Sequence, residues 1–141
     1  MRLTKSKAFT LVEILVVVVI LGVLAAIIIP SVVNATDDSA STSTYNELQK
    51  LRRHVEVFRS ANNNSLPAIV AGEGTWGELV SAQYLSAPPV NAWVGGANRR
   101  VIIIANAPDA AYQETHGWIF DNTTGDIWAG GFDGNDTPHP R

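Results

Sequence analysis

The sequence contains no cysteine among its 141 residues. That absence excludes a disulfide framework, a thiolate zinc site, an iron–sulfur cluster and a cysteine nucleophile. Charge is also scarce, since charged residues make up 16% of the chain, against roughly 25% in typical soluble domains. The formal net charge is −3, which argues against a nucleic-acid-binding surface. A chain of this length accommodates at most one ordinary soluble domain plus an appendage.

The missing charge is concentrated in one segment. Between Lys7 and Asp37 the only charged residue is Glu13. The run from Phe9 to Val33 is apolar and would measure roughly 37 Å as an α-helix with a rise of 1.5 Å per residue. A bilayer core of roughly 30 Å requires about 20 apolar residues, so this segment is long enough to cross a membrane. We expect it to be helical, because lipid-exposed backbone must satisfy its own hydrogen bonds.

Arg2, Lys5 and Lys7 precede the apolar run, and the positive-inside rule predicts a cytoplasmic N-terminus with the rest of the chain outside. A cleaved secretory signal would have a shorter apolar region of 7–15 residues ending at small residues, whereas this run continues past Leu24-Ala25-Ala26. A simple signal anchor leaves Glu13 unexplained, because a carboxylate within a membrane helix is costly and usually marks a function.

The segment from Lys7 to Glu13 reads KAFTLVE and resembles the type IV prepilin signature, and the resemblance continues to Pro30. In that family a dedicated prepilin peptidase cuts on the cytoplasmic side of the apolar run and methylates the new N-terminus. The resemblance therefore implies cleavage between Ala8 and Phe9, with N-methylation of Phe9. The family usually has glycine where this chain has Ala8.

The resemblance also implies a role in assembly for Phe9, Glu13, Gly22 and Pro30. A carboxylate buried among packed helices needs a partner, and in the family that partner is the α-amino group of the first residue, here Phe9, on a neighbouring subunit. The alternative is that Glu13 simply faces the lipid headgroups. Proline removes a backbone donor and clashes with the preceding turn, so we expect a kink or a locally melted stretch between Gly22 and Pro30.

Beyond the apolar run, hydrophobic residues recur at the spacings of one face of an amphipathic helix, namely Tyr45, Leu48, Leu51, Val55 and Phe58. Because the N-terminal helix of pilins continues into the head, we expect one helix from about Phe9 to Ala61. The expected organisation is a leader at 1–8, a transmembrane or filament-core helix at 9–33, its amphipathic continuation at 34–61 and a globular head with a flexible tail at 62–141.

In the head, Thr75 and Glu78 match a capping box, which predicts a short helix ending near Leu85. Patterns of β-branched and aromatic residues predict strands at 99–105 and 115–121, and 126–129 pairs back as a hairpin. The Gly/Asp/Pro-rich tail that follows is expected to be loop or disordered. The expected fold class is α+β and pilin-like, with the second half of the long helix packed on a small antiparallel sheet.

The tail carries closely spaced oxygen ligands at Asp133, Asn135 and Asp136, a set that suits calcium. Major pseudopilins often bind calcium in this region, and the segment Pro88–Trp93 (PPVNAW) is similar to a proline-rich segment of major pseudopilins of type II secretion. The alternative is a solvated acidic turn. Among the histidines there is no metal-ligand spacing, and no G-x-S-x-G elbow is present, so we expect no enzyme.

We therefore expect a structural subunit of a type IV pilus-like or type II secretion pseudopilus filament. Its expected partners are further copies of itself, prepilin peptidase, an inner-membrane assembly platform and membrane lipid, and bulk charge argues against nucleic acid. The precursor would cross the bacterial inner membrane once, and the mature filament would be periplasmic or extracellular. The alternative is a single-pass membrane-anchored extracytoplasmic binding module, calcium-dependent or not, that does not polymerise.

Overall fold

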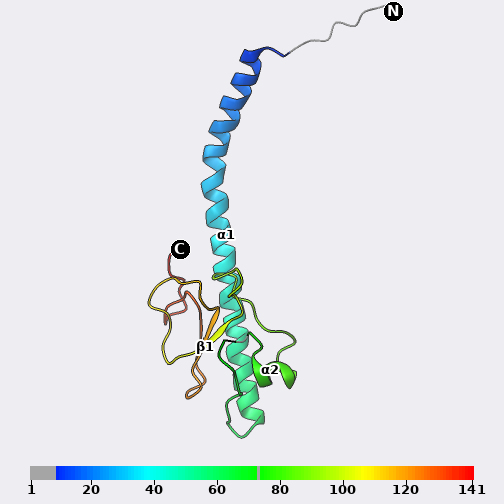
Figure 1. The fold of residues 1–141 in the computed structure, drawn as a ribbon, viewed down its shortest axis with the longest axis vertical. Coiled ribbons are helices and arrows are strands. Elements are labelled where there is room, and N and C mark those ends of the chain that lie inside the picture. Colours follow the sequence, from blue (N-terminus) through cyan, green and yellow to red (C-terminus); the bar gives the residue numbers. More distant parts are fainter. Residues whose placement is uncertain (1–8, 73) are drawn as a thin grey trace, which may run out of the picture. The chain divides into compact units, whose positions relative to one another are not determined.

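The computed structural model describes residues 9–72 and 74–141, apart from the side chains of residues 29–34 (Figure 1). Its elements are α1 (Leu11–Ala61), α2 (Gly77–Ser81), β1 (Ile102–Ile104), β2 (Trp118–Phe120) and β3 (Ile127–Ala129). The chain divides into two compact units between Thr36 and Asp37, although α1 is continuous in the backbone across that boundary. The second unit, Asp37–Arg141, is called the head below.

In the first unit, α1 exposes apolar side chains in every direction. The stretch Leu11–Ile28 is long and apolar enough to cross a membrane, and none of it is buried within the chain. A helix that is hydrophobic all round is stable only in a membrane or among other helices. The described backbone is helical through Gly22 and Pro30, so the locally melted stretch that the sequence suggests does not occur in this structure.

In the head, the second half of α1 forms one wall of the core. The predicted face is buried at Leu48, Leu51, Val55 and Phe58, whereas Tyr45 remains 44% exposed. These helix residues pack with the aromatic and aliphatic side chains of the sheet and of the loop before α2. The Trp76 ring, for example, lies edge-on to Trp118 and Phe120, with centroid separations of 6.2 and 6.4 Å, a favourable arrangement for aromatic rings.

The three strands form one sheet in the order β1-β2-β3. Strands β2 and β3 are antiparallel, with Ile119 opposite Trp128, as the hairpin prediction requires. Strands β1 and β2 are parallel, with Ile103 opposite Ile119, so the sheet is mixed rather than purely antiparallel. A parallel pair needs a long return connection, and the loop 105–117 provides it. The α+β, pilin-like fold with its long N-terminal helix is confirmed.

The capping box predicted at Thr75 is wrong. Helix α2 begins after Trp76, which is fully buried and adopts a left-handed backbone with φ of 56°. The Glu78 carboxylate accepts the backbone N–H of Ala68 at 2.8 Å instead of reaching back to a cap. Burial of the Trp76 ring thus decides the local backbone, and α2 ends at Ser81, well before the predicted limit.

The tail after β3 is irregular but ordered. Phe132 is 1% exposed and belongs to the core, and it forms an isolated antiparallel bridge with Pro138. The backbone N–H of His139 donates to the Gly131 carbonyl at 2.9 Å. The tail therefore folds back on itself and completes the core as a loop, which is the first of the two forms that the sequence predicts.

Candidate functional site

The first candidate site is the start of α1. Ala8, on the N-terminal side of the predicted cleavage, lies outside the described residues. Phe9 lies two residues before the first residue of α1 and is 80% exposed. Gly22, farther along α1, has open space where a Cβ would stand. The Pro30 side chain lies outside the described side chains. The site residues that the structure describes are therefore accessible to a neighbouring molecule.

Glu13 and Thr10 form a reciprocal cap at the beginning of α1. The Glu13 Oε2 atom accepts the Thr10 backbone N–H at 2.8 Å and the Thr10 hydroxyl at 2.9 Å. In return, the Glu13 backbone N–H donates to the Thr10 Oγ1 atom at 3.2 Å. This is a capping box, in which a Thr and a Glu three residues later satisfy each other's free N–H groups.

Our sequence reasoning overlooked this cap. The signal is present as Thr10-x-x-Glu13, and it stands immediately before an apolar helical run, where a capping box is expected. The same pattern at Thr75 and Glu78 forms no cap. Among the described residues, the Glu13 Oε1 atom has no hydrogen-bond partner, so half of this carboxylate remains available at the exposed surface of the helix.

The second candidate site is the tail segment predicted to bind calcium. The Asp133 Oδ1 atom accepts the backbone N–H groups of Asn135 and Thr137 at 2.8 and 2.9 Å. These bonds hold the pKa of the Asp133 carboxyl below its usual range, because they favour the ionised form. The bond from Thr137 has the largest effect. Asp133 therefore closes a tight turn, with its charge directed at backbone donors.

Asp136 is engaged by α1. The Arg52 guanidinium meets both Asp136 oxygens, with Nη1–Oδ2 at 2.5 Å and Nη2–Oδ1 at 2.8 Å, and Gln49 donates to Oδ2 at 3.3 Å. In the part of the chain that the structure describes, no group of three or more His, Asp or Glu residues is arranged to hold a metal ion. Calcium binding by Asp133, Asn135 and Asp136 stays a prediction, and it would have to displace Arg52.

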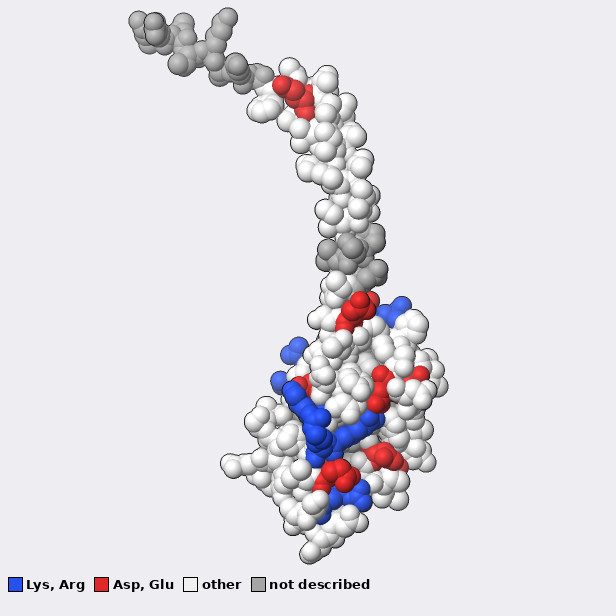
Figure 2. All heavy atoms as spheres, turned by 180° about the vertical axis from the view of Figure 1, so that it is seen from behind, with Lys and Arg blue, Asp and Glu red and all other residues white. Residues whose placement is uncertain are grey.

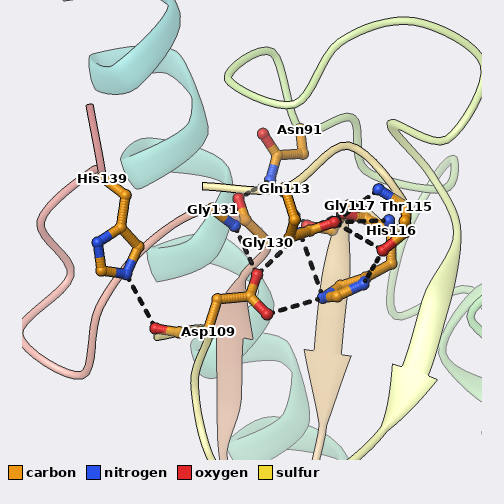
Figure 3. Close-up of polar contacts among 9 residues, drawn as sticks. All are labelled: Asn91, Asp109, Gln113, Thr115, His116, Gly117, Gly130, Gly131 and His139. Atoms are coloured by element: carbon orange, nitrogen blue, oxygen red, sulfur yellow. Dashed lines mark hydrogen bonds and ion pairs between the residues drawn. The ribbon is translucent and has the colours of Figure 1, made fainter. Parts of the chain in front are cut away.

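A partly buried polar network joins the loop 105–117 to the tail (Figure 3). The Asp109 carboxylate lies 3.3 Å from the His116 Nε2 atom and accepts the Gly131 backbone N–H at 2.8 Å. The Thr115 hydroxyl lies 3.0 Å from His116 Nδ1 but is also 2.8 Å from the Gln113 Oε1 atom, which can take its proton. A hydroxyl bonded in this way is poorly placed as a nucleophile, so we interpret the network as structural. Sequence spacing could not reveal it.

Asn91 is the central hydrogen-bonding residue of the head and is fully buried. Its amide nitrogen donates to the carbonyls of Gly117 and Gly130 at 2.7 and 2.9 Å. Its Oδ1 atom accepts the backbone N–H of Val94 at 2.9 Å and the hydroxyl of Thr44, on α1, at 3.2 Å. Both the amide nitrogen and the amide oxygen are thus bonded. These bonds connect the proline-rich segment to α1, to the residue before β2 and to the residue after β3.

Two other titratable groups of the head have shifted pKa values. The backbone N–H of Thr123 donates to Asp121 at 2.7 Å in the turn between β2 and β3, and it lowers the pKa of that carboxyl. Burial raises the pKa of the Tyr112 phenol, and its hydrogen bond to Glu114 acts in the same direction. Each shift follows from a local structural contact.

Comparison with known proteins concerns mainly the N-terminal segment. Residues 3–29 match the family model of the prokaryotic N-terminal methylation motif. The chain is also 34% identical over 62 residues to the type II secretion system core protein G of Pseudomonas aeruginosa, and this match covers 44% of each protein. The aligned part thus spans less than half of the relative. No solved structure matches the chain significantly. Together, the methylation motif and the partial match to a pseudopilin confirm the predicted resemblance of this chain to the pilin and pseudopilin family.

Proposed function

We propose that this protein is a structural subunit of a pilus-like or pseudopilus filament. The observation that carries the proposal is the first half of α1, whose residues Leu11–Ile28 are apolar and exposed on every side. Such a surface must be covered, by lipid in the precursor and by helices of other copies in the filament. The proposed role is mechanical and involves no catalysed reaction.

Processing would prepare this helix for packing. Prepilin peptidase would cut between Ala8 and Phe9, and the match to the methylation motif includes this bond. The cut frees an α-amino group four residues before Glu13. We infer that the Glu13 Oε1 atom receives that amino group from a neighbouring copy, while Oε2 remains bonded to Thr10 of its own chain. In an apolar surrounding such a charge pair is strongly favoured over either charge alone.

The same proposal covers location and partners. The precursor would cross the inner membrane once with a cytoplasmic N-terminus, as its flanking cations predict. After processing, an inner-membrane assembly platform would transfer copies from lipid into a periplasmic or extracellular filament. The support for these steps is the apolar helix and the resemblance to a pseudopilin.

Two substitutions separate capping from ion pairing at Glu13. Gln also completes a capping box, so Glu13→Gln keeps the cap but removes the charge. Thr10→Val keeps the charge but removes the cap, at a cost of about 1 kcal/mol. We expect Glu13→Gln to abolish filaments and Thr10→Val to retain most of them, as counted by electron microscopy in cells with equal amounts of each protein.

Abundant filaments from Glu13→Gln would remove the charge pairing from the proposal. If the unaltered chain is displayed outside the membrane yet stays unassembled, the membrane-anchored binding module is the better description. Mass spectrometry of the mature protein provides a separate check on processing, because cleavage at Ala8 leaves N-methylated Phe9 as the first residue. An intact Met1 in protein from its own host would contradict that step.

A further inference from the structure

The part of α1 that belongs to the head begins with a stretch of weak helix formers. Residues 37–43 read DDSASTS, and each of them except Ala40 is Asp, Ser or Thr. Such side chains compete with the helix for backbone hydrogen bonds, as the Ser41 hydroxyl does when it donates to the Asp38 carbonyl at 3.0 Å. Within residues 37–43, all of which the structure describes, none is buried. Intrinsic preference and packing therefore both leave the helix weak here.

The firmly packed part of α1 starts at the next residue, Thr44, which is fully buried. Its hydroxyl donates to the Asn91 Oδ1 atom at 3.2 Å and accepts the backbone N–H of Trp93 at 3.0 Å. The stretch 37–43 thus lies between the boundary of the two compact units, which falls just before Asp37, and the first residue of α1 that is fixed in the core.

The Arg141 guanidinium bridges this stretch. Its Nη1 atom donates to the Asp37 Oδ1 atom at 2.8 Å, and its Nη2 atom donates to the carbonyls of Trp93 and, at 3.4 Å, Ala92. The guanidinium carbon also lies 4.1 Å from the centre of the Trp93 ring, as in a cation–π interaction. Because the Trp93 N–H is bonded to Thr44, Arg141 connects the first residue of the stretch to the residue that follows it.

Arg141 is held more firmly on its tail side than at Asp37. Two residues earlier, the backbone N–H of His139 is bonded to Gly131, and Trp93 beneath the guanidinium is only 6% exposed. The Asp37 and Arg141 side chains are 37% and 32% exposed, so water competes for this pair. Figure 2 shows acidic and basic side chains intermingled over the head, so single contacts rather than a charged patch decide such pairs. The contact with Asp37 is therefore the one that opens first.

We propose that the pair of Arg141 with Asp37 is a clasp that keeps residues 37–43 helical, and that its release lets this stretch extend. Seven residues measure about 10.5 Å as an α-helix and about 24 Å when extended, so release lengthens the chain by about 13 Å. A pull on the head passes through this stretch in a filament subunit and in an anchored binding module alike. The inference goes beyond the proposed filament function, because it concerns a single chain.

Hydrogen exchange of the full-length protein in detergent micelles tests the clasp without force. Arg141→Ala should accelerate exchange several-fold in residues 37–43 and leave residues 48–58 nearly unchanged. Arg53→Ala is the matched control, because Arg53 is an exposed arginine of α1 outside the stretch. Unchanged exchange of residues 37–43 in Arg141→Ala would overturn the proposal.

A strengthened helix separates the clasp from a general effect of Arg141 on the tail. Replacing the three serines of the stretch with alanine, the best helix former, leaves Asp37 and Arg141 in place. In this triple alanine variant, Arg141→Ala should no longer accelerate exchange, because the stretch is stable without the clasp. An equal acceleration with and without the three alanines would mean that Arg141 acts elsewhere, which also overturns the proposal.

Single-molecule stretching measures the change in length. The chain has no native cysteine, so handles can be attached through Ala35→Cys and Ala61→Cys, at two exposed positions on either side of the stretch. We expect a first extension of about 13 Å before the head unfolds. Its force should be lower in Arg141→Ala and higher in the triple alanine variant. A chain that lengthens only when the whole head unfolds would contradict the clasp.

The outcomes separate this inference from the proposed function, because both measurements use single chains. An unaltered chain that never forms filaments but shows the expected exchange and extension overturns the filament function and supports the clasp. Normal filaments, together with exchange and extension that Arg141→Ala leaves unchanged, overturn the clasp alone.

Discussion

Arg52 on α1 and Asp136 in the tail form a two-point ion pair, and the same guanidinium donates to the Ile127 carbonyl from Nη2 at 2.8 Å and from Nε at 3.2 Å. One side chain thus joins the helix, the sheet and the tail. Asp136→Asn should destabilise the head by about 1.5–3 kcal/mol, typical of hydrogen bonds to charged groups. Asn tolerates the left-handed backbone found at this residue, where φ is 59°.

Chemical unfolding followed by tryptophan fluorescence measures this loss. In the Asp136→Asn variant, hydrogen exchange should accelerate more in residues 132–141 than in α1, relative to the unaltered protein. Lys50→Gln is a suitable control, because the Lys50–Glu47 pair is exposed and surface pairs of this kind contribute roughly 0–1 kcal/mol. If the two substitutions lowered the free energy of unfolding equally, the Arg52–Asp136 pair would contribute no more than an ordinary surface pair.

Asn91→Asp should destabilise the head more than Asn91→Ala at neutral pH. The substitution replaces two N–H donors with a carboxylate that faces the carbonyls of Gly117 and Gly130. Burial and these carbonyls would raise the pKa of the introduced acid, since both disfavour its charged form. The penalty is therefore present above that raised pKa and shrinks as the pH falls below it. Unfolding at pH 7 and pH 5 tests the sign, with Asn91→Ala as the pH-insensitive reference.

The turn at Asp133 should contribute acid sensitivity. Its pKa is lower in the folded chain than the ordinary value of 3.8, mainly because Thr137 donates its backbone N–H. An acid of this kind stabilises the fold fully above about pH 5 and loses its contribution as the pH falls through 3.8 toward the folded pKa. Asp133→Asn keeps an oxygen acceptor without a titrating group, so its stability should fall less between pH 5 and pH 3. Identical slopes for both proteins would contradict this assignment.

Calcium is predicted to bind at Asp133, Asn135 and Asp136, where it has to compete with Arg52. We therefore expect calcium to raise the melting temperature more in Arg52→Gln than in the unaltered protein, measured against a chelator. Magnesium is the control ion, because it demands stricter octahedral geometry. Equal melting temperatures with calcium and with chelator in both proteins would leave the turn as a solvated acidic segment.

The long helix was predictable because its signals are periodic and local. Apolar residues without interruption indicate the first half, and the spacing of Leu48, Leu51, Val55 and Phe58 indicates the face that becomes buried. The hairpin of β2 and β3 was predictable from turn chemistry at residues 122–125. In each case the residues that form the sequence pattern also form the helix or hairpin that the pattern predicts, or lie next to it.

The rest depends on contacts between distant residues. The parallel pairing of β1 with β2 follows from the path of the loop 105–117, and Trp76 overrides the capping pattern at Thr75 by entering the core. The pair of Arg52 with Asp136 joins residues 84 positions apart. At the N-terminal site, family resemblance identified Glu13, but the cap from Thr10 was missed although its motif is local.

Among the described side chains, the hydrophobic α1 residues buried in the core, Leu48, Leu51, Val55 and Phe58, all follow Asp37. The apolar N-terminal segment and the head therefore share the single helix α1, but each uses a separate part of it. A shortened chain that starts at residue 37 should remain water-soluble and keep its native tryptophan environment. The head could then be crystallised alone, without the apolar segment.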